Sequence, residues 1–250
     1  MTDADPWDAL SHYFDTSRAD VQSGSADNIL IAWPVILRFL ADHAPEGRTL
    51  RVLDYGCGGG AFAHALSAQG SQVVGIDASS AMIETARRVY GERIDFRVGN
   101  AQTLAATGPF DIITAIMVFQ FVEDMNEMLR QAAAALPEGG LLVFAVFNPA
   151  YVVERSEAGR AFLGFDSNTN PTTGFLEFSG GIRVPTFIRT ARAYNELAQS
   201  HGLTDLMEAY PPFTEEFLAR FPQSIPTKHS EYLILGYEKR STPRDLEQSR

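Results

Sequence analysis

The chain has 250 residues, of which 45% are hydrophobic and 20% are charged. Its 31 acidic and 20 basic side chains give a formal net charge of −11, which disfavours nucleic acid or an anionic membrane surface as the main partner. An acidic surface of this kind also simply favours solubility. The length and composition together predict a single globular domain, residues 1–250, with a full hydrophobic core.

The cysteine count and the N-terminal sequence indicate the cellular compartment in which the protein is expected. Cys57 is the one cysteine, so no intramolecular disulfide can form. The N-terminal region lacks the apolar run of a signal peptide, and no stretch approaches about 18 uninterrupted apolar residues. These features predict a cytoplasmic protein that does not span a membrane.

Residues 1–45 are expected to form a helical cap. The first 28 residues are polar, but they contain Trp7, Tyr13 and Phe14, which a plain disordered tail would not need. Residues 28–43 are apolar and helix-like, and Pro34 would sit early in that helix or kink it.

Residues 50–147 alternate between apolar runs and amphipathic segments. The apolar runs are continuous rather than alternating, which is typical of parallel strands that are covered on both faces. The sequence predicts strands at 50–55, 72–77, 93–98, 110–117 and 141–147, with helices at 61–69, 81–90 and 124–136.

The alternation stops at residue 148, and residues 148–188 are expected to form a lid or substrate insertion. Residues 150–185 look irregular. Their five aromatic side chains either line a pocket or form a small core under a long loop; they are Tyr151, Phe162, Phe165, Phe175 and Phe178. Beyond the insertion, the pattern predicts helices at 189–201 and 213–220, strands at 203–209 and 231–238, and a frayed tail at 239–250.

A cluster of glycines follows the first predicted strand, in the segment DYGCGGGA at 54–61. Gly56, Gly58 and Ala61 satisfy the dinucleotide pattern G-x-G-x-x-G/A, and Asp77 would then hold the ribose hydroxyls. Asp54 argues against this interpretation, because its carboxylate would repel a pyrophosphate and attract an ammonium group. The chain also lacks a second mononucleotide-binding half.

Five segments occur in the order VLDYGCGGG, GIDAS, VGNAQTL, FDIITAIMVFQFVED and LPEGGLLVFAVFNP. In this order they resemble the motifs of class I S-adenosylmethionine-dependent methyltransferases, and the resemblance covers about residues 50–238. It implies an α/β fold with a doubly wound, mostly parallel seven-stranded sheet. The last two strands would form an antiparallel C-terminal hairpin, and the lid insertion would follow the fifth strand.

The resemblance also implies the residues that bind S-adenosyl-L-methionine. Asp54 would lie near the methionine ammonium and Asp77 would accept from the ribose hydroxyls. Asn100 stands where the family usually has Asp; it would hold the adenine edge, or alternatively be a turn residue. Cys57 is predicted to fill space in the loop rather than to act as a nucleophile. The predicted cofactor contacts are Asp54, Gly56, Cys57, Gly58, Asp77, Ala78, Met82, Asn100, Ala101, Gln102, Met117 and Val118.

Methyl transfer requires an aligned acceptor and the exclusion of water. The acceptor contacts predicted from the resemblance are Tyr13, Phe14, Phe119, Gln120, Asn148, Tyr151 and Phe175. Gln120 would orient the acceptor, because an amide cannot remove a proton.

The candidate bases are His12 and His229, and His12 is favoured because His229 is expected at the remote edge of the hairpin. A lone histidine is nevertheless more often a surface or structural residue. Arg189 and Arg192 could hold an acidic acceptor, although solvated charges at a helix end are the more ordinary interpretation.

The sequence therefore predicts a methyltransferase that uses S-adenosyl-L-methionine and acts on a small, apolar or aromatic metabolite, as a monomer or homodimer. No metal site, nucleic-acid partner or membrane partner is expected. Two alternatives remain: a non-catalytic binding protein of the same fold, and an NAD-dependent oxidoreductase that uses the same glycines.

Overall fold

The centre of the molecule is a seven-stranded sheet with the strand order β3-β2-β1-β4-β5-β10-β9. A computed structural model describes residues 4–12, 14, 27–159, 161–166, 169–221 and 227–240. Strands β1 to β5 are parallel, whereas β10 runs antiparallel to both of its neighbours, β5 and β9. The predicted fold class is confirmed. The strands are β1 (Arg51–Tyr55), β2 (Gln72–Asp77), β3 (Asp95–Val98), β4 (Ile112–Ile116), β5 (Leu141–Phe147), β9 (Leu203–Ala209) and β10 (Tyr232–Lys239).

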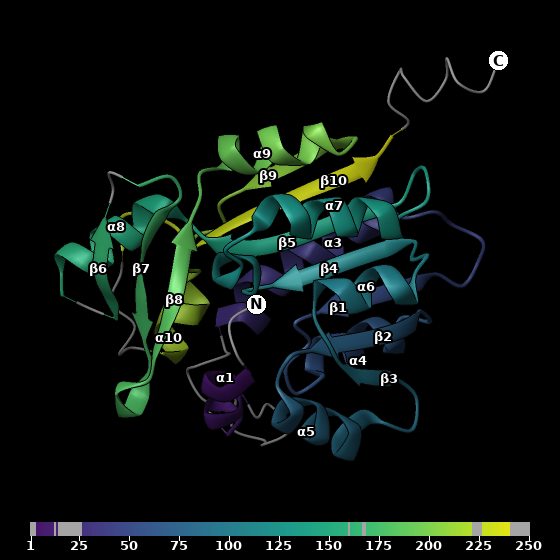
Figure 1. Cartoon of the computed structure of the whole chain (residues 1–250), viewed down its shortest axis with the longest axis horizontal. Helices are drawn as coiled ribbons and strands as arrows, with labels where there is room; N and C mark the ends of the chain where they lie inside the picture. Colours follow the sequence, from purple (N-terminus) through teal and green to yellow (C-terminus); the bar gives the residue numbers. More distant parts are fainter. Residues whose placement is uncertain are drawn as a thin grey trace.

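Helices cover both faces of this sheet (Figure 1). Strand β5 shows why its sequence is apolar throughout: Leu142 and Phe144 enter the hydrophobic cluster on one face, while Leu141 and Val143 enter the cluster on the other. One cluster includes side chains of α6 (Ala101–Thr107), α7 (Met125–Ala135) and α9 (Ala191–Ser200). The other includes side chains of α3 (Trp33–His43), α4 (Ala61–Ala68), α5 (Ser80–Tyr90) and α10 (Glu215–Arg220).

Within the described part of the N-terminal region, α1 (Ala4–Leu10) and the π-helical turn η1 (Asn28–Ala32) precede α3 and the sheet. The turn η1 runs directly into α3, and Pro34 lies in the first turn of α3, as expected from the sequence. The side chain of Asp27 accepts a hydrogen bond from the backbone N–H of Asn28 at 2.8 Å and so caps this segment.

The insertion after β5 is ordered, which corrects the expectation that residues 150–185 are irregular. It consists of α8 (Pro149–Glu157) and a three-stranded antiparallel sheet of β6 (Phe162–Asp166), β7 (Thr172–Glu177) and β8 (Arg183–Ile188), with a 3₁₀ turn η3 (Ser179–Gly181). Gly164, Gly174 and Pro185 interrupt the alternation that would have signalled strands. Pro185 is tolerated because β8 is an edge strand.

The small sheet stands beyond the carboxyl ends of β4 and β5 (Figure 1). A third hydrophobic cluster attaches it there, and this cluster joins Leu10 of α1 to Phe121, Phe147 and the inner face of the insertion. Phe121 belongs to a 3₁₀ turn, η2 (Phe119–Phe121), that follows β4. Among the residues that the structure describes, no helix has the length and apolar character needed to cross a membrane.

Candidate functional site

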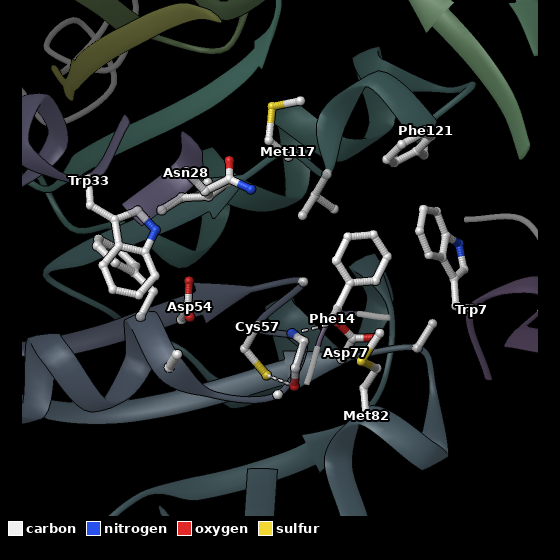
Figure 2. A pocket seen from close by; sticks show the side chains of 18 of the residues that line it. Trp7, Phe14, Asn28, Trp33, Asp54, Cys57, Asp77, Met82, Met117 and Phe121 are labelled. Atoms are coloured by element: carbon white, nitrogen blue, oxygen red, sulfur yellow. Dashed lines mark hydrogen bonds between the residues drawn. The ribbon is translucent and has the colours of Figure 1, made fainter. Parts of the chain in front are cut away.

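A cavity of about 180 Å³ opens at the carboxyl edge of the parallel strands. We call it the edge cavity (Figure 2). Its lining is mostly apolar, with a small number of polar groups, as is usual for a small-molecule site. It is lined by Trp7, Phe14, Asn28, Ile29, Trp33, Asp54, Gly56, Cys57, Gly58, Gly59, Ala61, Phe62, Asp77, Ala78, Met82, Ile116, Met117, Val118 and Phe121.

The glycine loop, residues 56–60, lines one side of the edge cavity. The backbone N–H groups of Gly56 and Cys57 donate to the carbonyl of Ile76 at 2.6 and 3.1 Å, which ties the loop to β2. Gly56 has a φ of +69°, and a Cβ atom at this position would lie 2.2 Å from a methyl carbon of Val118. Only glycine fits between the two segments, so the loop and the end of β4 approach closely.

Asp77 is placed at the tip of β2 by the loop itself. One carboxylate oxygen accepts from the backbone N–H of Gly58 and the other from that of Ser79, both at 2.9 Å. Burial raises the pKa of Asp77, although these hydrogen bonds act in the opposite direction. The carboxylate is therefore held at the cavity wall, where it can accept hydrogen bonds from hydroxyl groups.

Asp54 lies deeper, at the end of β1, and is only 2% exposed. Its Oδ1 accepts from the hydroxyl of Thr114 at 2.9 Å, and Thr114 is its partner in register on β4. Its Oδ2 is buried and has no partner among the described residues. Burial, and secondarily the charge of Asp77, raise the pKa of Asp54 to about 7. A cationic donor inside the cavity would satisfy the unpaired oxygen and favour the charged form.

Met117 lies where β4 ends, and its backbone has a φ of +56°. Such a left-handed conformation is unfavourable for a residue with a side chain, and it persists only where the surroundings fix it. Here the backbone N–H of Met117 donates to the carbonyl of Ala145 at 2.8 Å. The strain is located at the cavity wall, as is common at ligand sites.

The N-terminal helix α1 closes one side of the edge cavity. Asp8 accepts from the hydroxyl of Ser79 at 2.5 Å and from the backbone N–H of Ala81 at 3.2 Å, at the start of α5. The hydrogen bond from Ser79 lowers the pKa of Asp8. The ring of Trp7 meets that of Phe121 edge to face at a centroid distance of 4.7 Å. Helix α1 thus connects α5 to the end of β4.

The other side of the edge cavity is closed by η1 and the start of α3. Trp33 packs against Phe62 of α4 with ring centroids 4.9 Å apart, and Asn28 supplies a polar side chain. Figure 2 shows Trp33 and Asn28 at the Asp54 end and Trp7 and Phe121 at the opposite end. Sequence analysis missed nine lining residues. Five belong to the covering segments, Trp7, Asn28, Ile29, Trp33 and Phe121, and four to the glycine loop, α4 and β4, Gly59, Ala61, Phe62 and Ile116.

The structure brings ten of the predicted residues together around the edge cavity: Phe14, Asp54, Gly56, Cys57, Gly58, Asp77, Ala78, Met82, Met117 and Val118. Nine others do not line it: His12, Asn100, Ala101, Gln102, Phe119, Gln120, Asn148, Tyr151 and Phe175. Tyr13 lies outside the described residues.

Two of the predicted polar contacts serve as helix caps. Asn100 accepts from the backbone N–H groups of Gln102 and Thr103 and begins α6, a helix that the sequence analysis did not predict. Asn148 accepts from the backbone N–H of Ala150 at the start of α8 and donates to the carbonyl of Ser230 at 2.9 Å. The local structure of both side chains is explained without a ligand.

The turn after β4 places its two other predicted residues away from the edge cavity. Phe119 is fully buried in the core and packs against Phe144 at a centroid distance of 4.8 Å. Gln120 is 1% exposed, and neither polar atom of its amide has a partner among the described residues. An unsatisfied buried amide is costly, so Gln120 remains a candidate contact for a group from outside the chain.

The aromatic side chains of the insertion form a small core. Phe162 packs edge to face on both Phe147 and Tyr151, and Phe178 packs against Trp7 and Phe14. Phe175 is 45% exposed. The structure therefore favours the interpretation of these aromatics as a core under the insertion over that of a pocket lining.

The candidate histidines and arginines lie outside the edge cavity. His12 is exposed and does not line the edge cavity. His229 was expected at the remote edge of the hairpin, but β10 begins opposite the carboxyl end of β5, so His229 lies at the same edge of the sheet as the cavity, exposed and outside its lining. Arg189 is not a solvated helix-end charge: it is 6% exposed and donates to the carbonyl of Glu123 at 2.6 Å. Arg192 is exposed and pairs with Glu196 at 2.7 Å.

Cys57 lines the edge cavity, but its chemistry is that of a small packing residue. Burial raises the pKa of the Cys57 thiol well above its usual value, which disfavours the nucleophilic thiolate. Within the described part of the chain, no group of three or more His, Cys, Asp or Glu side chains is arranged to hold a metal ion.

The chain is similar to known methyltransferases. The family model described as "Methyltransferase domain" matches residues 30–208. A ubiquinone biosynthesis O-methyltransferase from Idiomarina loihiensis is 33% identical over 120 residues, which are 46% of this chain and 49% of that protein. One from Chelativorans is 41% identical over 103 residues, which cover 40% and 41% of the two chains. The matched region thus spans less than half of these relatives.

Solved structures share the fold along more of the chain. The PH0226 protein from Pyrococcus horikoshii superimposes with a TM-score of 0.68 at 20% identity, covering 93% of this chain and 99% of its own. An S-adenosylmethionine-dependent methyltransferase from Mesorhizobium loti gives a TM-score of 0.61 at 20% identity, covering 82% and 96%. The shared fold agrees with the family match over residues 30–208, and that match supports the S-adenosylmethionine interpretation of the glycine loop over the dinucleotide one.

Proposed function

We propose, since the chain belongs to the methyltransferase domain family, that it transfers a methyl group from S-adenosyl-L-methionine to a small acceptor with an apolar or aromatic frame. The observation that carries this proposal is the pair of carboxylates along one wall of the edge cavity. Asp54 offers an unpaired buried oxygen, and Asp77 offers a carboxylate held by the glycine loop. This donor set fits a ligand with an ammonium group at one end and ribose hydroxyls further along.

The bound cofactor supplies an electrophilic methyl group on a sulfonium. The contribution of the protein is binding, alignment and the exclusion of water. Asp54 would hold the ammonium and Asp77 the ribose hydroxyls, while Gly56 and Met117 bring the loop and the end of β4 against the ligand. Trp7 and Phe14 would cover it from the N-terminal side.

The acceptor is proposed to be apolar or aromatic because the covering side of the edge cavity is lined by rings. The relatives named ubiquinone biosynthesis O-methyltransferases favour an oxygen atom as the methylated position. The adenine contacts Asn100, Ala101 and Gln102 and the acceptor contacts Gln120, Asn148, Tyr151 and Phe175 stay predictions, as does the choice of a base.

Calorimetry with S-adenosylhomocysteine tests the cofactor assignment. The wild-type protein should bind it, and Asp77→Ala should weaken binding by roughly 1.5–3 kcal/mol, which is tenfold or more, through lost ribose hydrogen bonds. Asp95→Asn is the matched control, because Asp95 is an exposed carboxylate at the start of β3 that pairs with Arg97.

Three outcomes would count against the proposal. Absence of S-adenosylhomocysteine binding by the wild-type protein would remove the cofactor assignment. Tight binding of NADH, measured by its fluorescence, would favour the oxidoreductase. Binding of the product cofactor with no methyl transfer to a broad panel of phenols and amines would favour a non-catalytic binding protein.

A further inference from the structure

Two side-chain N–H donors point into the edge cavity at its Asp54 end. Figure 2 shows the amide nitrogen of Asn28 and the indole nitrogen of Trp33 on the sides of their side chains that face the cavity. Within the described part of the chain, Nδ2 of Asn28 and Nε1 of Trp33 donate to no other residue. Both N–H groups are therefore available to a ligand.

The π-helical turn η1 explains why these two side chains lie together. The backbone N–H of Trp33 donates to the carbonyl of Asn28, which is the i→i+5 hydrogen bond of a π-helix. In an α-helix, side chains on one face are three or four residues apart, so Asn28 and Trp33 would face different directions. The wider turn brings both onto the face that covers the cavity.

Each donor is fixed in direction by a contact behind it. Oδ1 of Asn28 accepts from the hydroxyl of Tyr232 at 3.2 Å, so the amide presents its Nδ2 to the cavity. The ring of Trp33 packs against Phe62 with ring centroids 4.9 Å apart, and an indole nitrogen can only donate. The two residues thus form an uncharged donor pair that exists before a ligand binds.

The rest of the Asp54 end offers few other donors to an anion. Among the described residues that line the edge cavity, there is no lysine, arginine or histidine. The backbone N–H groups of Gly56, Cys57 and Gly58 already donate within the protein. Asp54 itself accepts a hydrogen bond from a neighbouring hydroxyl, and its charged form would repel an anion.

We propose that Asn28 and Trp33 together bind the α-carboxylate of the cofactor, while Asp54 binds its ammonium group. This inference rests on the proposed function, because it assigns the methionine end of the same cofactor. The two groups of an amino acid share one carbon, so the carboxylate must lie close to the ammonium at Asp54. The carboxylate is thus recognised by N–H donors without a cation.

The donor pair would also orient the methionine end. Asp54 lies at the end of β1, whereas the donors come from η1 and the start of α3, so the two charged groups have sites on different segments. Asp54 attracts the ammonium and repels the carboxylate, and the donors do the reverse. Because hydrogen bonds to ionised groups are the strong ones, the reversed orientation is disfavoured at both sites.

Two probes that differ only in the carboxylate test this inference: S-adenosylhomocysteine and decarboxylated S-adenosylhomocysteine. Both keep the adenosine, the thioether and the ammonium group. Calorimetry on the full chain at pH 8, above the pKa of about 7 of Asp54, measures their affinities. The wild-type protein should bind S-adenosylhomocysteine at least about tenfold more tightly than the decarboxylated probe.

The variants Trp33→Phe and Asn28→Asp each remove one donor. The first keeps an aromatic ring against Phe62, and the second keeps the shape of the side chain and the oxygen that Tyr232 contacts. Each should contract the ratio of the two affinities by about tenfold, because only S-adenosylhomocysteine loses a hydrogen bond to a charged group. Unfolding midpoints report whether each variant is folded.

Each variant has a matched control. Trp7→Phe removes an indole N–H at the opposite end of the edge cavity, and it should change both affinities by the same factor. Asn126→Asp adds the same charge at an exposed position of α7 outside the cavity lining, and it should leave the ratio unchanged.

The wild-type protein also gives a direct signal for the indole. The chain has two tryptophans, so NMR of a nitrogen-15-labelled sample shows two indole signals, which either Trp→Phe variant assigns. S-adenosylhomocysteine should move the Trp33 proton downfield, as a hydrogen bond to a carboxylate does. The decarboxylated probe should move it much less.

The results separate this inference from the cofactor assignment. If the wild-type protein does not bind S-adenosylhomocysteine, the proposed function is wrong. If it does, three results would overturn the carboxylate assignment alone: equal affinities of the two probes, a ratio that either donor substitution leaves unchanged, and an equal contraction in Trp33→Phe and Trp7→Phe. A contraction in both donor variants but in neither control, together with the shift of the Trp33 signal, would support it.

Discussion

The polar groups on one side of the edge cavity come from one short stretch of chain, whereas the polar group on the other side is held by a segment far away in the sequence. The loop side consists of the ends of β1, β2 and β4, and its polar groups, Asp54, Gly58 and Asp77, fall within 24 residues. The cover side consists of α1, η1 and α3, backed by α8 and β10, and Asn28 reaches Tyr232 across 204 positions. The loop side is recognised from its own sequence, whereas the cover side exists only once the chain has folded.

The two sides should therefore respond differently to substitution. Changes on the loop side act on the cofactor and often on the fold itself, because the strands that carry it form the centre of the sheet. Changes on the cover side should act on how a ligand is enclosed or chosen, with a smaller effect on stability.

The largest effect is expected from Gly56→Ala on the loop side. The new Cβ would lie 2.2 Å from Val118 at a φ of +69°, so steric overlap adds to backbone strain. We expect a loss of roughly 2–4 kcal/mol in the free energy of unfolding, together with loss of cofactor binding. Denaturant unfolding and calorimetry measure the two effects.

Gly58→Ala is the matched control for this substitution. Gly58 also has a positive φ, +51°, but nothing lies within 4 Å of a Cβ placed there. It should lose only the strain of about 1 kcal/mol. Equal losses in the two variants would show that the contact with Val118 does not determine the loop geometry.

A pH titration tests the unpaired oxygen of Asp54. With a pKa of about 7 in the free protein, Asp54 is protonated below neutrality and attracts an ammonium group less. The affinity for S-adenosylhomocysteine should fall about tenfold for each pH unit below 7. Calorimetry between pH 5.5 and pH 8, with the range set by the titration of Asp54, measures this slope. Asp54→Asn should flatten it.

The stability of the free protein should change with pH in the opposite direction. The pKa of Asp54 is raised from 3.8 on folding, so the native state holds a proton that the unfolded chain releases above that value. The contribution of Asp54 to stability is therefore complete below about pH 4 and is lost as the pH rises to about 7. A stability profile that Asp54→Asn leaves unchanged would contradict the raised pKa.

The smallest effect is expected on the cover side, from Asp8→Ala. This substitution removes the hydrogen bonds to Ser79 and Ala81 that dock α1 on α5, and should cost about 1 kcal/mol, as the loss of a helix cap does. Hydrogen exchange should increase in α1 while the central sheet stays protected. Ser80→Ala, which removes only a 3.5 Å contact with Asp8, is the control. Equal exchange in both variants would show that Asp8 does not fasten α1.

Sequence patterns predicted the loop side because its signals are local. The continuous apolar runs of β1, β2, β4 and β5 mark strands covered on both faces, and the cluster of glycines at 56–60 that follows β1 stands out in the chain. Ser79 precedes the helix predicted at 81–90 and is a residue type that caps helices, and it does accept from the backbone N–H of Met82. Such features depend on a few adjacent residues, so a single sequence reveals them.

The cover side could not be predicted because its signals are weak or misleading. Trp7 and Trp33 are aromatic residues in segments whose positions depend on distant contacts, such as that between Asp8 and Ser79. Helix α6 was also missed, although Asn100 and Thr103, which form its capping box, stand three residues apart in the sequence. The strands of the insertion were hidden by Gly164 and Pro185, which lie on the two edge strands, and by Gly174 in the central strand.

The insertion leaves and rejoins the sheet at two fixed points. At its start, Asn148 bonds both Ala150 and the carbonyl of Ser230, and at its end the guanidinium of Arg189 bonds the carbonyl of Glu123. Between these two points, the strands among the described residues of 149–188 pair only with one another. The insertion is thus structurally separable. A related segment grafted between Asn148 and Arg189 would replace the small sheet beyond β4 and β5 and leave the strands of the central sheet unchanged.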